Sequence, residues 1–214
     1  MTRDAPGPVV VIGAGGHAKV VIEAMRAAGL TLAGLVDPRP DAASLLGIPV
    51  LGGDDALPQL RADGIRAAVV ALGANRARER VGEALRALEY VLPIVVHPAA
   101  LVSESARLNE GVVVMARAVV GTLAEVGALA ILNTGCVVEH DNHIGACAHI
   151  APGAVLAGTV QVGERALVGV GAVARPGVII GRDAVVGAGS AVVGDIPPGA
   201  VVGGVPARPL ARRA

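Results

Sequence analysis

Large aromatic side chains are almost absent from this sequence. Its 214 residues include no Trp, no Phe and a single tyrosine, Tyr90. Yet 53% of the residues are hydrophobic, and Val, Ala, Leu and Ile supply nearly all of the apolar volume. We therefore do not expect a mixed globular core built on aromatic anchors. A composition this rich in small and β-branched residues, with 30 glycines, favours a narrow and regular β architecture.

Net charge is also missing, since 18 basic residues balance 18 acidic ones. Without a positive field or stacking aromatics, we expect no nucleic-acid binding. Every long apolar run contains glycine, proline or histidine, so we expect no transmembrane helix and no membrane partner. The two cysteines, Cys136 and Cys147, lack the spacing of metal ligands, and we expect them to be reduced core residues of a cytoplasmic protein.

Residues 1–97 alternate between strand and helix patterns. Residues 8–12, 32–36 and 67–72 are short apolar runs typical of buried strands, and a glycine-rich turn at 13–17 leads from the first run into a helix. Asn75 stands where it can cap a second helix. The pattern predicts a small Rossmann-like α/β domain with a parallel sheet.

From Val102 onward the sequence repeats every six residues, as far as Val192. Fifteen of the sixteen lead positions are Val, Ile or Leu, and the residue four places later is small or Val in nearly every hexad. This pattern predicts a parallel β-helix over residues 98–214, in which three hexads form one triangular coil and coils stack at ~4.8 Å. The lead residue faces the interior of the prism. Asn142 breaks the rule at an inward place, where it can satisfy local backbone groups.

With eighteen residues in each predicted coil, residues eighteen apart in the sequence lie side by side. His140 lies in the turn part of its hexad beside Asp141, and Gly158 is one coil of eighteen residues further on. An imidazole with a flanking carboxylate can act as a general base, and a glycine N–H can face an oxyanion. The alternatives are a solvated turn histidine and an ordinary repeat glycine. We predict catalytic roles for His140, Asp141 and Gly158.

Three histidines within ten residues raise a metal alternative. Tetrahedral zinc needs ligands that converge on one point. His140, His143 and His149 occupy different places around the predicted prism, so we expect no metal, with His143 in a solvated turn.

The turn at residues 13–18 matches the G-x-G-x-x-A dinucleotide fingerprint, with Asp37 about twenty residues on. Taken alone, this pattern indicates NAD. The physical basis is more general, because N–H groups at a helix start receive phosphate and an acid after the second strand receives a ribose hydroxyl. The domain is too short for a complete dinucleotide fold, so we favour a nucleotide sugar over a purely structural turn.

Taken together, these blocks resemble the left-handed β-helix acyltransferases, and specifically the sialic-acid and bacillosamine type of sugar acetyltransferases. The blocks that carry the resemblance are residues 11–18, 35–37, 71–75, 97–98, 132–141, 144–145, His149 and 203–208.

The resemblance implies transfer of acetyl from acetyl-CoA to an amino group, less readily a hydroxyl, of a UDP-linked amino sugar. It also implies a homotrimer with active sites between neighbouring prisms. It assigns His140 as general base, Asp141 as its acidic neighbour and His149 as an acetyl-CoA contact, and we expect the coenzyme to pass Val170 and Ala188. The nucleotide-sugar residues are Gly15, Gly16, His17, Asp37 and Asn75.

Three other functions stay open from sequence. One is O-acetylation of sialic acid. Another is a metal-dependent hydratase of the carbonic anhydrase type, and the third is a non-catalytic trimeric scaffold.

Overall fold

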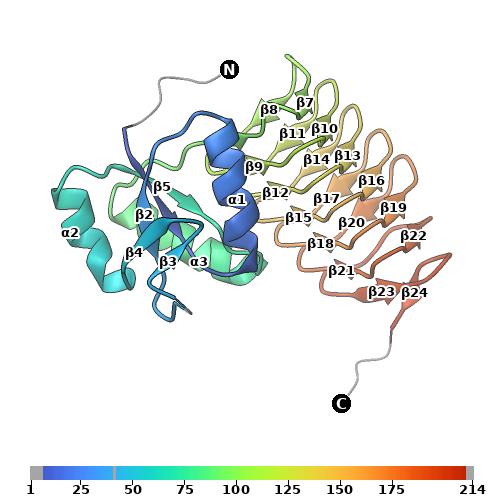
Figure 1. Ribbon diagram of the computed structural model, residues 1–214. Coiled ribbons are helices and arrows are strands. Elements are labelled where there is room, and N and C mark those ends of the chain that lie inside the picture. Colours follow the sequence, from blue (N-terminus) through green and yellow to red (C-terminus); the bar gives the residue numbers. More distant parts are fainter. Residues whose placement is uncertain (1–6, 41, 211–214) are drawn as a thin grey trace. The chain divides into compact units, whose positions relative to one another are not determined.

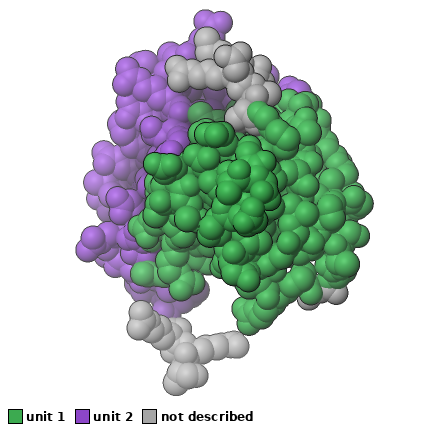
Figure 2. All heavy atoms as spheres, turned by 90° about the vertical axis from the view of Figure 1, so that its left-hand side faces the viewer, with its two compact units in different colours: residues 1–96 green, residues 97–214 purple. Residues whose placement is uncertain are grey.

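The chain divides into two compact units, Met1–Val96 and His97–Ala214, which Figure 2 distinguishes by colour. The boundary lies one residue before the expected one at 97. The computed structural model describes residues 7–40 and 42–210. Within those residues, no helix is both long enough and apolar enough to cross a bilayer.

In its described residues, the first unit contains a five-stranded sheet and three α-helices (Figure 1). The sheet order is β3-β4-β2-β1-β5, parallel except for the β3–β4 pair. Its strands are β1 (Val9–Ile12), β2 (Leu32–Val36), β3 (Ser44–Leu45), β4 (Ile48–Gly52) and β5 (Ala67–Val70). Its helices are α1 (Gly16–Ala27), α2 (Leu57–Ala62) and α3 (Asn75–Ala87), with a 3-10 turn, η1 (Asp54–Ala56), before α2. The unit closes with β6 (Val95–Val96).

The central strands explain the continuous apolar runs of the sequence. All residues of β1 and β5 are buried, as parallel strands covered on both faces require. In the sheet order, β2 lies on one side of β1 and β5 on the other. The turns that follow β1 and β5 therefore flank the point where the strand order reverses, and open α/β sheets bind ligands at this point.

The second unit is a left-handed parallel β-helix with three faces (Figure 1). The first face comprises β7 (Leu101–Val102), β10 (Val119–Val120), β13 (Val137–Val138), β16 (Val155–Leu156), β19 (Val173–Ala174) and β22 (Ala191–Val192). The second comprises β8 (Arg107–Leu108), β11 (Glu125–Val126), β14 (His143–Ile144), β17 (Gln161–Val162) and β20 (Ile179–Ile180). The third comprises β9 (Val113–Val114), β12 (Ile131–Leu132), β15 (His149–Ile150), β18 (Leu167–Val168), β21 (Val185–Val186), β23 (Val201–Gly203) and β24 (Arg208–Pro209).

The six-residue repeat maps onto this prism as predicted. Successive coils pair in register at eighteen residues, as in the pairing of Val119 with Val137. From Val114 to Val192 every lead residue is buried, and it is the second residue of its strand. Small residues fill the corners beside the lead residues, which explains why no large aromatic ring has a place in this core. The predicted fold class is confirmed for both parts of the chain.

Candidate active site

The residue pair His140 and Asp141 occupies the corner between β13 and β14. His140 Nδ1 lies 2.7 Å from Asp141 Oδ2. Because an ionised carboxylate only accepts hydrogen bonds, Nδ1 is the donor in this contact, and in the neutral imidazole Nε2 then holds the lone pair. Asp141 has φ of 56°, a left-handed conformation that aspartate tolerates better than most residues. Both side chains are about half exposed, with 56% of the His140 side chain accessible, so the imidazole is open to a reactant.

Gly158 lies beside His140 on the next coil, as the coil arithmetic predicted. A Cβ on Gly158 would collide with Cε1 and Nε2 of the imidazole. The backbone itself does not demand glycine here, because the left-handed residue of this corner is Thr159, with φ of 61°. The missing side chain therefore makes room for the imidazole. It also places Nε2 of the imidazole beside Gly158.

His149 projects from β15, on the third face. Its Nε2 lies 3.0 Å from Asn133 Nδ2, and Asn133 Oδ1 accepts the Thr134 N–H at 2.8 Å. This second bond orients the amide so that its NH2 group faces His149, which makes Nε2 the acceptor and places the imidazole proton on Nδ1. Asn133 was missed from the sequence. It occupies the place after the lead residue, where the repeat shows only a tendency to glycine.

The expected acetyl-CoA residues gather along one edge of the prism. Val170 and Ala188 lie at successive turns of the corner that follows the third face, and the Gly189 N–H donates to Val170 O at 2.8 Å. His149 lies on that third face, one coil before Val170. His140 lies at a different corner. One chain therefore does not bring its candidate base and its candidate acetyl-CoA residues together.

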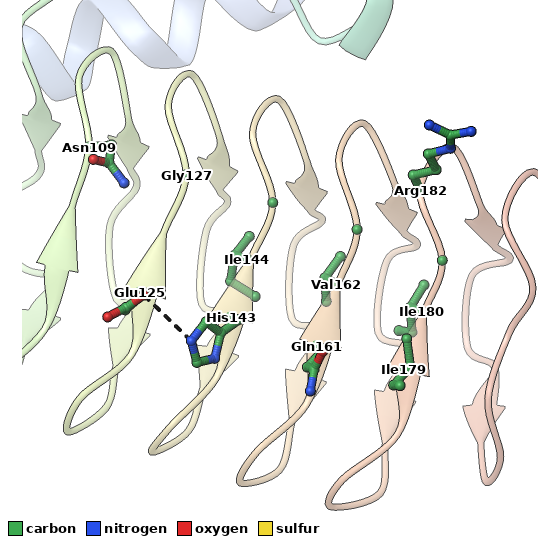
Figure 3. A pocket seen from close by; sticks show the side chains of 13 residues that line it. Asn109, Glu125, Gly127, His143, Ile144, Gln161, Val162, Ile179, Ile180 and Arg182 are labelled. Carbon is green, nitrogen blue, oxygen red and sulfur yellow. Dashed lines mark ion pairs between the residues drawn. The ribbon is translucent and has the colours of Figure 1, made fainter.

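A groove of about 410 Å³ runs along the second face (Figure 3). Its lining includes Glu125, His143, Gln161, Ile179 and Arg182. His143 is on strand β14, with Nε2 3.5 Å from Glu125 Oε2, so the expectation of a solvated turn was wrong. Among the residues that the structure describes, no group of three His, Cys, Asp or Glu side chains is arranged to hold a metal ion.

Neither cysteine is placed for covalent catalysis. Cys136 and Cys147 are both buried, and they form no disulfide with each other. Burial raises the pKa of the Cys136 thiol to about 12, so the nucleophilic thiolate is not formed near neutral pH.

In the first unit, the turn after β1 is held by Asp37. Asp37 Oδ2 accepts the Ala14 N–H and Oδ1 accepts the Arg39 N–H, each at 2.8 Å. Asp37 thus organises the glycine-rich turn as well as standing near it. A Cβ on Gly15 or Gly16 would meet nothing within 4 Å, so packing does not require glycine at either position. The bare backbone faces open space at the start of α1, where N–H groups lack helical partners.

A small pocket of about 150 Å³ opens at this turn. Its lining residues are Ala14, Gly15, Gly16, Lys19, Ala42, Ser44 and Leu45. The pocket therefore combines exposed N–H groups with the only lysine of the chain, a combination suited to an anion.

The turn after β5 is held by a buried cation from α3, Arg78, which the sequence pattern did not indicate. Arg78 is 1% exposed, and its Nη1 donates to Leu72 O at 2.8 Å and Gly73 O at 3.1 Å. Asn75 is the first residue of α3 and Ala74 takes the cap position, so the expected capping role of Asn75 was wrong. Instead, Asn75 Oδ1 accepts from Arg78 Nη2 at 2.8 Å.

His17 lies within electrostatic reach of this guanidinium. Burial, and secondly the charge of Arg78, lowers the pKa of His17. His17 is therefore neutral at neutral pH, and it can offer a ligand a hydrogen bond but no charge.

The family model described as the PglD N-terminal domain matches residues 8–85. No curated protein sequence matches the chain.

Solved structures match over nearly the whole chain. A histidine-to-asparagine variant of perosamine N-acetyltransferase from Caulobacter crescentus, in complex with CoA and GDP-perosamine, is 50% identical, with a TM-score of 0.94 and coverage of 96% of this chain and 97% of that one. The acetyltransferase domain of PglB from Neisseria gonorrhoeae, in complex with acetyl coenzyme A, is 41% identical, with a TM-score of 0.90 and coverage of 95% and 98%. WeeI from Acinetobacter baumannii is 27% identical, with a TM-score of 0.88 and coverage of 95% and 99%.

Proposed function

This chain belongs to the sugar N-acetyltransferases of the hexapeptide-repeat acyltransferase superfamily, and from that premise we propose that His140 is the general base of its reaction. The enzyme uses acetyl-CoA as co-substrate, and the proposed acceptor is the amino group of a nucleotide-linked amino sugar. One observation carries the proposal. His140 Nδ1 lies 2.7 Å from Asp141 Oδ2, while Nε2 lies beside Gly158, whose missing side chain leaves room for the imidazole.

The proposed reaction is direct transfer between the two bound substrates. The sugar amine attacks the thioester carbonyl, and His140 Nε2 takes the proton that the nitrogen loses as the C–N bond forms. The carbonyl oxygen becomes an oxyanion and accepts the Gly158 N–H. When the C–S bond breaks, the imidazolium returns its proton to the leaving thiolate. Asp141 holds the imidazole in place through the hydrogen bond at Nδ1, and the products are the N-acetyl sugar and coenzyme A.

The proposal also concerns which nucleotide the acceptor sugar carries. The sequence led us to expect UDP, whereas the Caulobacter relative was solved with GDP-perosamine. We place GDP-perosamine first, because it is the ligand of the Caulobacter relative, and UDP-linked amino sugars second. The pocket at Gly15 and Gly16 is suited to the diphosphate that both share. Coenzyme A release is measured with GDP- and UDP-linked amino sugars and with free sialic acid. Release only with sialic acid would instead indicate O-acetylation, and no release with any acceptor would favour the scaffold.

Substitution of Gly15 by valine tests the proposed diphosphate site. Gly15 has φ of −83° and ψ of −167°, an extended backbone that valine adopts readily, and a Cβ there meets no neighbour. We expect a normal fold and an unchanged KM for acetyl-CoA. The KM for the nucleotide sugar should rise about tenfold or more, because the side chain obstructs the N–H groups at the helix start. An unchanged KM for the sugar would remove Gly15 from the site.

We also propose that the active site forms between copies of the chain in a trimer. Support comes from the separation of His140 from His149, Val170 and Ala188, which lie along a different edge of the same prism. A base from one copy then acts on acetyl-CoA held by the edge of its neighbour.

Mixing two inactive variants tests this arrangement. His140→Ala and His149→Ala chains are each expected to have low activity as homotrimers. If the two residues of one site come from different copies, co-expressed chains form some sites with both histidines intact, and activity returns. The rate of coenzyme A release by tagged mixed trimers is compared with the rate of each homotrimer. Mixed trimers no more active than the homotrimers would show that the two residues act within one chain.

A further inference from the structure

Asn142 is an amide at a place where the repeat otherwise holds a small or aliphatic residue. It stands four places after the lead residue Val138, the position occupied by Ala124 and Val160 in neighbouring hexads of the same corner. Its side chain is fully buried, with 0% exposure. A buried amide needs hydrogen-bond partners, so the partners of Asn142 indicate why an amide stands at an otherwise apolar position.

The Asn142 side chain joins two coils at the corner of His140 and Gly158. Its Nδ2 donates to Glu139 O at 2.7 Å and to Ala157 O at 2.9 Å. In the preceding coil the corresponding carbonyl, that of Gly121, accepts the Ala124 N–H at 3.3 Å instead. In the described part of the chain no such backbone bond reaches the carbonyls of Glu139 and Ala157. The amide therefore replaces the turn hydrogen bond in both coils.

The bond to Ala157 O sets the direction of the Gly158 N–H. The carbonyl of Ala157 and the N–H of Gly158 belong to one trans peptide group, in which the two bonds point in opposite directions. Because the Ala157 carbonyl is directed at a buried amide, the Gly158 N–H is directed away from the interior of the prism. A hydrogen bond to the carbonyl also polarises the peptide and strengthens its N–H as a donor.

The orientation has a cost in stability. Asn142 Oδ1 is buried and has no hydrogen-bond partner among the described residues. A buried unpaired carbonyl oxygen is destabilising, so Oδ1 offsets part of what the two hydrogen bonds of the amide NH2 group contribute. The amide at this place therefore serves the carbonyls it holds rather than the packing of the prism.

We propose that Asn142 is a positioning residue for acetyl transfer, whose buried amide fixes the Ala157–Gly158 peptide so that its N–H meets the oxyanion. The proposal rests on the proposed function, in which Gly158 donates to the oxyanion and His140 is the base. Asn142 itself touches no substrate, and its contribution appears only as charge develops on the thioester oxygen.

Asn142→Ala is the direct test, because alanine is the residue that the repeat uses at this place. We expect kcat to fall about tenfold or more, since a loosened oxyanion donor loses part of the roughly 10²–10³-fold that a whole donor contributes. KM for acetyl-CoA and for the sugar should stay within about twofold, because Asn142 acts only on the transition state. The pH profile of kcat should keep its shape, since the His140–Asp141 contact is untouched.

Ser190→Ala is the matched control. Ser190 is the other polar residue at this place of the repeat, and it is fully buried inside the prism. It lies at the corner that follows the third face, where the surface carries Ala188, and not at the corner of His140. It should change kcat by less than twofold. Asn142→Cys, which also keeps a small buried side chain, serves if the alanine variant fails to fold.

The outcomes separate this proposal from the proposed function. Full activity of Asn142→Ala and Asn142→Cys would overturn the positioning role while leaving the base untouched. An equal loss of kcat in Ser190→Ala would also overturn it, because any buried polar residue would then matter alike. Full activity of His140→Ala would instead refute the proposed function itself.

Discussion

Replacement of His140 by alanine is expected to lower kcat by about 10²–10⁴-fold, the range that a general base contributes. The amine would then lose its proton only to water. The imidazole lies at a corner with more than half of its side chain exposed, so its removal opens no cavity in the core. The measurement is steady-state release of coenzyme A, with acetyl-CoA binding and oligomeric state determined on the same sample.

The control for this variant is His143→Ala, three residues further on. His143 is also exposed, lies on β14 and pairs with Glu125 at 3.5 Å rather than with Asp141. We expect its kcat to stay within about twofold of native, because an exposed ion pair contributes little to stability. An equal loss in both variants would mean that this segment tolerates no change and would remove the specific argument for His140.

Gly158→Ala is expected to produce the second largest loss, with kcat lower by about 10²–10³-fold. The added methyl occupies the space of the His140 imidazole, so the base, the oxyanion donor or both must move. Thr159, and not Gly158, carries the left-handed φ of this corner, so backbone strain does not explain a loss. The kinetics are measured alongside the melting temperature.

Gly194→Ala provides the comparison for the added methyl group. Gly194 lies in the same prism, and a Cβ there meets nothing within 4 Å. It should leave kcat and the melting temperature near native. A Gly158→Ala enzyme with native kcat would show that the imidazole need not contact this peptide.

The sequence predicted the prism and the pair at its corner because both follow from an unbroken period. A lead residue every six positions requires an inward side chain at each strand, and eighteen residues to a coil place Gly158 beside His140 without further information. The same logic identified buried β1 and β5 from continuous apolar runs. Residues 44–62, which contain β3, β4 and α2, carry short half-exposed elements without a clear period, and no element was predicted there.

Contacts made by rotamers and turns were beyond the reach of sequence patterns. Asn133 orients His149 and Arg78 holds the turn after β5, and each depends on side-chain directions that no spacing specifies. Asn75 resembled a cap because its residue type suits that position, yet the helix begins one residue earlier than the pattern indicated. For Asn142 the sequence showed the anomaly, and only the structure showed which carbonyls it holds.

The most direct test of the account is the mass of the sugar product. GDP-perosamine is incubated with acetyl-CoA and the native enzyme, with His140→Ala in parallel, and the nucleotide sugar is analysed by mass spectrometry with fragmentation. We expect one added acetyl group on the sugar nitrogen with the native enzyme and almost no acetylated product with the variant. An acetyl group on oxygen, or equal product from both proteins, would contradict it.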